Sequence, residues 1–287
     1  MRTGWLQLSG RRSRWVMAMP TANSPVGPST PALALSGREH RRLADVLLLA
    51  ARNRTPVDPL SRRYPELTAA DAAKIRDLTI ARRLADGERL IGAKPELGWL
   101  TDRMLKPGPQ LDLGDLIHPL VEPKLALQLH SPLRRPVSSL AGLLANTERV
   151  LPCIEILDPR CGTAALTGVD ATADNGAAAR LVIGAGAAPP SASGLRAVEL
   201  EFELRTPSRE SGSPLHARSA PSPAPLVRLA EALIQERKDL GNRALLLTPG
   251  WAQPTVLPEG AFVRAHFTGI GAVELMAAGH AGDRHCQ

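Results

Sequence analysis

The sequence predicts a mixed α+β fold, in which a small helical region precedes a larger region of short strands. The 287 residues include 24 glycines and 26 prolines, and this abundance of turn-forming residues disfavours a helical bundle. Apolar residues make up 44% of the chain, which is enough to form a hydrophobic core. Helical periodicity comes first along the chain, and short apolar segments between prolines and glycines follow from about residue 91.

Residues 1–36 are rich in arginine, serine and proline and contain no acidic residue. The arginine pair at 11–12 before an apolar stretch is a weak match to a twin-arginine or transit signal. Pro20 ends that stretch after about five residues, short of the roughly 7–15 that a signal sequence uses. We therefore expect a disordered leader over residues 1–36, or a true translation start at Met17 or Met19.

The positive charge of the chain is concentrated near its beginning. The formal net charge is +7, and residues 1–42 hold seven arginines and one acidic residue, so the rest is almost neutral. Aromatic residues account for only 3%, which leaves few side chains to stack on bases. No apolar run approaches the roughly 18 residues that span a bilayer, and three cysteines without a CxxC motif are typical of a reducing compartment. We expect a cytoplasmic protein with no nucleic-acid or membrane partner.

Two helices are predicted before residue 90. Apolar residues within 43–50 recur at i, i+3, i+4 and i+7, which is the spacing of one helix face. Thr68 and Asp71 have the spacing of a capping box, in which both side chains accept hydrogen bonds from backbone N–H groups at a helix start. The helix that begins there is expected to end at Gly87.

Strands and two further helices are predicted in the remainder. In residues 121–129 the side chains alternate with a period of two, so Glu122 and Lys124 share one face of a strand. Residues 204–225 are rich in serine and proline and lack periodicity, which predicts a long surface loop. The other expected elements are helices over 139–147 and 225–238 and strands over 150–157, 244–247, 261–267 and 272–276.

Two acidic residues lie within apolar strands. Glu155 is flanked by isoleucines, and Glu122 lies between Val121 and Pro123. A buried carboxylate is unfavourable unless it is paired or bound to a cation. Two such acids on neighbouring strands would form part of an oxygen-ligand site for Mg²⁺ or Mn²⁺. From the residues alone an alternative stands, in which each acid lines the solvent face of the sheet or pairs with a nearby arginine.

Six short segments, spread over most of the chain, form a recognisable pattern by their order and spacing. They are Arg54–Pro56, Tyr64–Thr68 with Asp71–Ala72, Leu116–Pro123, Leu151–Arg160, Ala173–Asn175 and Phe267–Val273. Through this pattern, residues 38–278 resemble the fumarylacetoacetate hydrolase superfamily, in its branch of 2-hydroxypentadienoate (2-oxopent-4-enoate) hydratases and 4-oxalocrotonate decarboxylases.

The resemblance implies a mixed β-sheet roll of the fumarylacetoacetase C-terminal-like type over residues 91–278. A helical region over 37–90 would precede it, and a tail over 279–287 would follow. It also implies one divalent metal ion, Mg²⁺ or Mn²⁺, held by a Glu-x-Glu pair on one strand and a third Glu on another. Such an ion polarises the 2-oxo group of the substrate and stabilises the enolate. A lysine and a short acid then move protons while water adds to the conjugated double bond.

Matched position by position, Glu122 corresponds to the first metal ligand and Glu155 to the third. Lys124 stands where the second ligand of the Glu-x-Glu pair is expected. A fixed positive charge there repels a divalent cation. An alternative to the metal site is therefore an internal ion pair of Lys124 with both carboxylates, which would leave a site that needs no metal.

The proton-transfer residues correspond to Lys94 and Glu96, although most of the lid segment expected between them is missing. A solvated lysine in a turn is the alternative interpretation of Lys94. Thr248 matches a Ser/Thr at the end of a core strand, and we expect it to contact substrate.

The resemblance leads us to expect a metal-dependent lyase, a hydratase that adds water to 2-hydroxypenta-2,4-dienoate-type 2-oxo acids in the degradation of aromatic compounds. Two alternatives stay open: a 4-oxalocrotonate-type decarboxylase that uses the same electron sink, and a catalytically impaired relative that has lost the metal site because of Lys124. Members of the superfamily assemble as homo-oligomers, so we also expect self-association.

Overall fold

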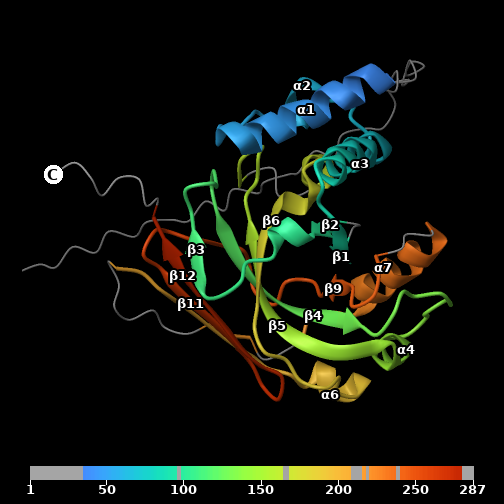
Figure 1. Ribbon diagram of the computed structural model, residues 1–287, viewed down its shortest axis with the longest axis vertical. Coiled ribbons are helices and arrows are strands. Elements are labelled where there is room, and N and C mark those ends of the chain that lie inside the picture. Colours follow the sequence, from blue (N-terminus) through green and yellow to red (C-terminus); the bar gives the residue numbers. More distant parts are fainter. Residues whose placement is uncertain are drawn as a thin grey trace, which may run out of the picture. The chain divides into compact units, whose positions relative to one another are not determined.

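Two mixed β-sheets form the centre of the structure (Figure 1). The computed structural model describes residues 35–95, 98–163, 168–207, 215–217, 220–236 and 240–279, so the expected leader, except for its last two residues, and almost all of the tail lie outside the described residues. The larger sheet has the strand order β2-β1-β9-β4-β5-β6, with β10 beside β4. Its strands are β1 (Leu90–Lys94), β2 (Gly98–Thr101), β4 (Leu120–Leu129), β5 (Thr147–Leu157), β6 (Ala178–Ile183), β9 (Leu245–Leu247) and β10 (Thr255–Val256).

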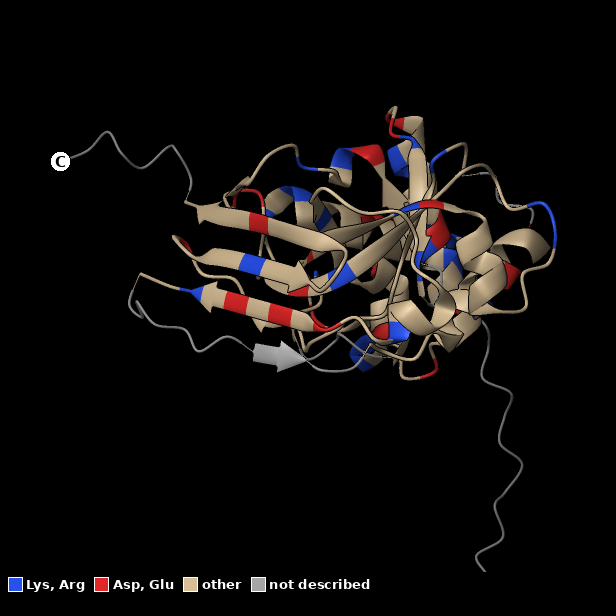
Figure 2. Cartoon of the chain, turned by 90° about the horizontal axis from the view of Figure 1, so that it is seen from below, with Lys and Arg blue, Asp and Glu red and all other residues tan. Residues whose placement is uncertain are grey.

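The smaller sheet has the order β3-β12-β11-β7-β8. Its outer face is charged because successive side chains of a strand point to opposite faces. Figure 2 shows acidic and basic positions on neighbouring strands, and Arg264 and Glu274 form an ion pair across two of them at 3.3 Å. The strands are β3 (Gln110–Asp112), β7 (Leu200–Arg205), β8 (Leu215–Ala217), β11 (Phe262–Phe267) and β12 (Gly271–Ala278).

A large apolar core joins the two sheets and the helices α4 (Leu140–Ala145) and α7 (Ala224–Gln235). Ile154 of the larger sheet and Phe267 of the smaller sheet are completely buried in this core. The ring of Trp251 packs edge-on against Phe267, with ring centres 5.1 Å apart. Ile154 and Glu155 are neighbours in β5 and point to opposite faces, so the face of β4 and β5 that carries Glu122 and Glu155 is turned away from this core. The remaining short elements are α5 (Gly168–Ala173), α6 (Ala192–Arg196) and the 3₁₀ turns η2 (Asp102–Met104) and η4 (Asn175–Ala177).

The first helices, α1 (Gly37–Asn53), α2 (Leu60–Arg63) and α3 (Ala69–Ala85), share a separate apolar cluster. The predicted capping box of α3 is confirmed, because Asp71 N–H donates to Thr68 Oγ1 and Thr68 N–H donates to Asp71 Oδ2, both at 3.1 Å. The sequence argument missed a second capping box, between Ser36 and Glu39 at the start of α1.

The predicted α+β class is confirmed, and the five predicted strands correspond to β4, β5, β9, β11 and β12. The predicted helices over 139–147 and 225–238 correspond to α4 and α7. The prediction of an unstructured loop over 204–225 is wrong in part, because β7 continues to Arg205 and β8 occupies Leu215–Ala217. In β7 the buried Leu200 and Phe202 alternate with the exposed Glu201 and the half-buried Glu203, a pattern too short to stand out in the sequence. Across the described residues, the helices are too short or too polar to cross a membrane.

Candidate active site

The antiparallel ladder of β4 and β5 brings the candidate acids together. Glu122 lies directly opposite Glu155, and Lys124 lies opposite Cys153. Because residues i and i+2 of a strand share a face, the side chains of Glu122, Lys124 and Glu155 converge on the same side of the sheet. The alternative of a solvent-facing strand is wrong, since the side chains of Glu155 and Glu122 are 1% and 14% exposed.

Four ionic groups alternate in this buried cluster. Lys124 Nζ lies 3.0 Å from Glu122 Oε2 and 2.7 Å from Glu155 Oε2. Lys94, the last residue of β1, donates to Glu155 Oε1 at 2.5 Å and to the carbonyl oxygen of Gly176 at 2.8 Å. Lys94 is buried, so its interpretation as a solvated turn lysine is wrong. The two ammonium groups balance the two carboxylates, and we call these four side chains the charge cluster.

Burial and charge act differently on the two lysines. Burial lowers the pKa of Lys94 below its ordinary value, because the Glu155 carboxylate compensates only in part for lost hydration. Burial also opposes charge on Lys124, but Glu155 and Glu122 together raise the pKa of Lys124 above its ordinary value. Burial disfavours ionised Glu155 as well, yet Lys124 and Lys94 outweigh it and lower the pKa of Glu155. Lys124 is therefore the more firmly protonated of the two lysines.

Three glycines make room for the charge cluster. A Cβ atom on Gly250 would lie 1.8 Å from Glu122 Oε1, and a Cβ on Gly98 would lie 2.7 Å from Lys94 Cγ. A Cβ on Gly176 would lie 2.7 Å from Lys94 Cε, and its φ of +59° also favours glycine. The sequence alone assigns none of the three to the site, because glycines are frequent and only the folded chain shows which of them touch the charge cluster.

A cavity of about 270 Å³ opens onto the charge cluster. Lys94, Glu122 and Lys124 line it together with Arg76, and Pro249 and Pro254 form part of its wall. Arg76 is buried, donates to Asp77 Oδ1 through Nε at 3.0 Å, and lies over the ring of Trp99. Sequence reasoning missed Arg76, since it lies within a predicted helix and belongs to no motif. The cavity suits a small anion, because cationic side chains predominate in its lining.

The segments that carry the sequence resemblance also bind one another and neighbouring parts of the fold. Asp158 Oδ1 accepts hydrogen bonds from the N–H groups of Ile117 and His118, which fixes the segment that leads into β4. Arg160 donates to Asp174 Oδ1 at 2.5 Å. Asn175 exchanges two hydrogen bonds with the backbone of Trp99, at 2.7 and 2.8 Å. These contacts position β2 and η4, and with them the Gly176 carbonyl that Lys94 binds.

Two predicted site residues stand apart. Glu96 lies outside the described residues, in the short gap between β1 and β2. Thr248 follows β9, and its Oγ1 accepts hydrogen bonds from Leu125 N–H at 3.1 Å and from Trp251 Nε1 at 3.2 Å. Thr248 lines a small separate cavity rather than the one that contains Lys94. Its contact with substrate remains a prediction.

The donor set does not fit a divalent metal ion. Mg²⁺ and Mn²⁺ prefer several oxygen ligands, whereas here two carboxylates already neutralise two ammonium groups. Within the described part of the chain, no group of three or more His, Cys, Asp or Glu residues is arranged to hold a metal. Glu155 Oε2 receives no aligned hydrogen bond from the described residues, but the ammonium of Lys124 lies against it at 2.7 Å.

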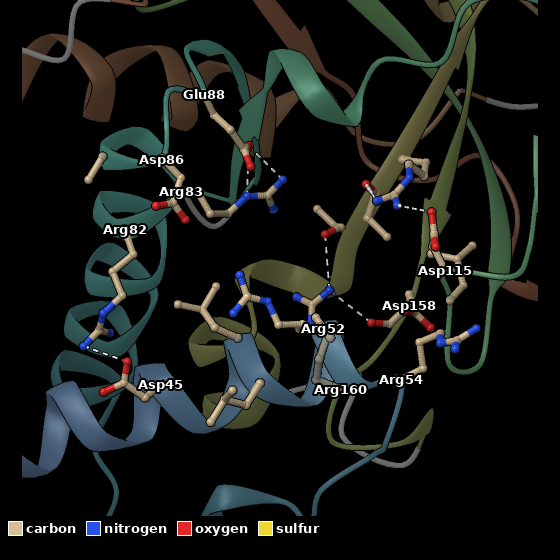
Figure 3. Close-up of a pocket in the computed structure, with 18 residues that line it drawn as sticks. Asp45, Arg52, Arg54, Arg82, Arg83, Asp86, Glu88, Asp115, Asp158 and Arg160 are labelled. Atoms are coloured by element: carbon tan, nitrogen blue, oxygen red, sulfur yellow. Dashed lines mark hydrogen bonds and ion pairs between the residues drawn. The ribbon is translucent and has the colours of Figure 1, made fainter.

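A second, larger cavity of about 820 Å³ lies among α1, α3 and the start of β6 (Figure 3). Arginines and acids pair along its walls, as in Arg82 with Asp45 and Arg83 with Glu88, both at 2.9 Å. Lys94, Glu122 and Glu155 do not line this cavity. We therefore assign the candidate active site to the smaller cavity, because three side chains of the charge cluster line it and are accessible to a small ligand there.

Comparison with known proteins identifies relatives, although no protein-family model matches the chain. It is 34% identical over 166 residues to a 2-hydroxypent-2,4-dienoate hydratase of Pseudomonas putida, an alignment that covers 52% of this chain and 75% of that protein. It is 31% identical over 182 residues to a 2-hydroxyhexa-2,4-dienoate hydratase of Comamonas testosteroni, covering 57% of this chain and 69% of that protein. A 4-oxalocrotonate decarboxylase of Pseudomonas sp. is 28% identical to this chain over 235 residues, which cover 74% of this chain and 88% of that protein.

Solved structures share the fold. Two structures of 4-oxalocrotonate decarboxylase from Pseudomonas putida G7, complexed with calcium and acetate or with magnesium and adipate, superpose with TM-scores of 0.72 and 0.73. Both are 22% identical in sequence and cover 86% of this chain and 99% of their own. With the hydratase relatives above, these matches show that the chain belongs to the branch of the fumarylacetoacetate hydrolase superfamily that contains 2-hydroxypentadienoate hydratases and 4-oxalocrotonate decarboxylases.

Proposed function

We propose that this protein is a hydratase that adds water to 2-hydroxypenta-2,4-dienoate-type 2-oxo acids, as in the degradation of aromatic compounds. The observation that carries this proposal is the cavity of about 270 Å³ whose lining includes Arg76, Lys94, Glu122 and Lys124. The hydratase relatives at 34% and 31% identity support the same substrate class.

In this proposal the substrate carboxylate and its C2 oxygen lie against Arg76 and Lys124. Fixed cationic groups in a water-poor site stabilise the negative charge that develops on an enolate oxygen. The enol first becomes the 2-oxo form, with its hydroxyl proton lost and a proton gained at C5. Water then adds its oxygen at C4 and a proton at C3, which yields 4-hydroxy-2-oxopentanoate.

Lys94 is the candidate for moving protons. Its ammonium lies on the cavity wall and is held by Glu155 and the carbonyl of Gly176, so its position is fixed relative to the substrate. A general acid or base must lie within hydrogen-bond reach of the reacting atom. Glu155, which is almost completely buried, orients the amine, and the hydroxyl proton that the substrate loses replaces the proton that Lys94 gives to C5.

The charge of the site favours a hydratase over a decarboxylase. Three cationic side chains line the cavity, but Glu122 lines it too, Glu155 pairs with both lysines, and Asp77 holds Arg76. These three acids offset the three cations, so the six side chains carry no formal net charge. A site without excess positive charge suits one carboxylate, as in 2-hydroxypenta-2,4-dienoate, better than the two carboxylates of 4-oxalocrotonate.

The experiment is turnover of 2-hydroxypenta-2,4-dienoate by the purified full chain, followed by loss of its ultraviolet absorbance and by NMR of the product. We expect 4-hydroxy-2-oxopentanoate from the wild type and none from Lys94→Met. Lys74→Met, at an exposed position of α3, is the matched control and keeps wild-type activity. Release of CO₂ from 4-oxalocrotonate without hydration would identify a decarboxylase, and no reaction with either acid would identify an impaired relative.

We also propose that the protein acts in the cytoplasm as a homo-oligomer and does not bind nucleic acid. The buried, unpaired thiols of Cys153 and Cys161 support a reducing compartment. Size-exclusion chromatography with light scattering tests self-association, and a monomer at micromolar concentration would contradict it.

A further inference from the structure

The position of Lys124 is the feature from which we draw a further inference. Its ammonium lies between one oxygen of Glu122 and one oxygen of Glu155, at 3.0 and 2.7 Å. These two carboxylates are directly opposed in the β4–β5 ladder, and Lys124 is two residues beyond Glu122 on the same strand. The lysine therefore bridges two acids on adjacent strands, as a bound cation would.

The other oxygen of Glu155 is also occupied, because Lys94 donates to Glu155 Oε1 at 2.5 Å. Each carboxylate of the charge cluster is therefore already paired with at least one ammonium group. A hard divalent cation needs several oxygen ligands, and it would have to displace these ammonium groups to obtain them.

Burial and the two flanking carboxylates hold the ammonium of Lys124 in this position. Its side chain is 7% exposed, on a strand with β5 on one side and β9 on the other. Moving it away would leave two carboxylates buried beside a single ammonium, which is strongly unfavourable. The bridging position is therefore a stable feature of the fold and not one rotamer among many.

Lys124 also faces the cavity. It lines the cavity of about 270 Å³ together with Arg76 and Lys94. An ammonium group has three N–H donors and no acceptor, so it serves both as a charge and as a hydrogen-bond donor to an oxygen anion in the cavity.

We propose that the ammonium of Lys124 is a built-in cation, which binds the carboxylate and 2-oxo group of the substrate where metal-dependent relatives use a divalent ion. This inference rests on the proposed 2-oxo acid substrate, and it makes the protein independent of metal. The relatives solved with calcium or magnesium share the fold. In this chain Lys124 of β4 supplies the positive charge instead.

The first test measures metal and ligand binding without turnover. Purified full-length protein is titrated calorimetrically with Mg²⁺, with Mn²⁺ and with pyruvate, the simplest 2-oxo acid, before and after EDTA treatment. We expect neither metal to bind and the affinity for pyruvate to be the same after EDTA. One tightly bound Mg²⁺ or Mn²⁺ per chain, or loss of pyruvate binding in EDTA, would overturn the proposal.

The second test uses variants. Lys124→Gln is expected to weaken pyruvate binding about tenfold or more, since it removes a charged donor, while Lys74→Gln on the surface of α3 leaves it unchanged. Lys124→Glu is expected to gain binding of about one Mg²⁺ per chain, because three carboxylates then converge. Circular dichroism verifies folding, and if either variant fails to fold, the wild-type titrations alone decide. Unchanged pyruvate affinity in a folded Lys124→Gln would contradict the proposal.

The outcomes separate this inference from the proposed function. Hydration that requires Mg²⁺ would leave the hydratase assignment intact and overturn the built-in cation. Metal-free pyruvate binding without hydration of 2-hydroxypenta-2,4-dienoate would support the built-in cation and overturn the hydratase assignment.

Discussion

Glu122 and Glu155 are register partners in the β4–β5 ladder, and a lysine ammonium lies between their carboxylates. Two directly opposed acids repel each other in a sheet, and burial makes this repulsion larger. The ammonium of Lys124, on the same face of β4 as Glu122, offsets this repulsion. Lys94 contributes a second ammonium from β1. The arrangement stabilises the fold and at the same time presents positive charge to the cavity.

Removing Lys124 is therefore expected to destabilise the protein. Lys124→Met leaves two buried carboxylates with a single ammonium, and breaking a buried pair in this way costs about 3–5 kcal/mol. Urea unfolding of the wild type and the variant measures the difference in the free energy of unfolding. Lys74→Met, at an exposed position, is expected to change it little. Equal stability of Lys124→Met and wild type would show that the charge cluster is not paired as described.

Gly176 is expected to matter through Lys94. In Gly176→Ala the new Cβ would lie 2.7 Å from Lys94 Cε, so the lysine must move, and a displacement of this kind lowers kcat/KM by about 100-fold. Gly108→Ala is the control, because Gly108 also has a positive φ, +78°, but a Cβ there meets nothing within 4 Å. Both variants are expected to lose about 1–2 kcal/mol of stability from the left-handed backbone, and only Gly176→Ala to lose activity. If the two variants lose activity equally, the contact with Lys94 is not the cause.

The capping box of α3 predicts a stability that depends on pH. The hydrogen bond from Thr68, together with that from His40, lowers the pKa of Asp71 below its ordinary value despite burial. A carboxyl with a lowered pKa stabilises the fold above its unfolded pKa of about 3.9, and this stabilisation is lost as the pH falls through its folded pKa. Thr68→Ala is expected to cost about 1 kcal/mol above pH 5. The difference should shrink below pH 4 in urea unfolding series, and a difference independent of pH would contradict this role of Asp71.

Thr248 is expected to act on stability through its hydroxyl oxygen. Thr248→Val leaves the N–H groups of Leu125 and Trp251 without their acceptor, which costs about 1–3 kcal/mol for buried donors. Thr248→Ser keeps the oxygen and is expected to be closer to wild type. Thermal unfolding of the two variants makes the comparison. A Thr248→Val protein as stable as Thr248→Ser would show that the oxygen is not needed to join β9 to β4.

Local patterns in the sequence were enough to predict α3, α4, α7 and the central strands, because hydrophobic periodicity and helix caps depend only on residues a few positions apart. The shared face of Glu122 and Lys124 followed from the period of a strand, and β4 carries both on one face. The partnership of Lys94 with Glu155 was not predictable, since 61 positions separate them and only the pairing of β1 with β9 brings them together. The same holds for Arg76, which reaches the cavity from α3, and for the glycines that enclose the charge cluster.

The most direct test of a hydratase with a built-in cation is the initial rate of hydration of 2-hydroxypenta-2,4-dienoate by the full-length protein in EDTA and in Mg²⁺. The structure predicts the same rate in both, because Lys124 supplies the positive charge. A rate that disappears in EDTA and returns with Mg²⁺ would contradict it.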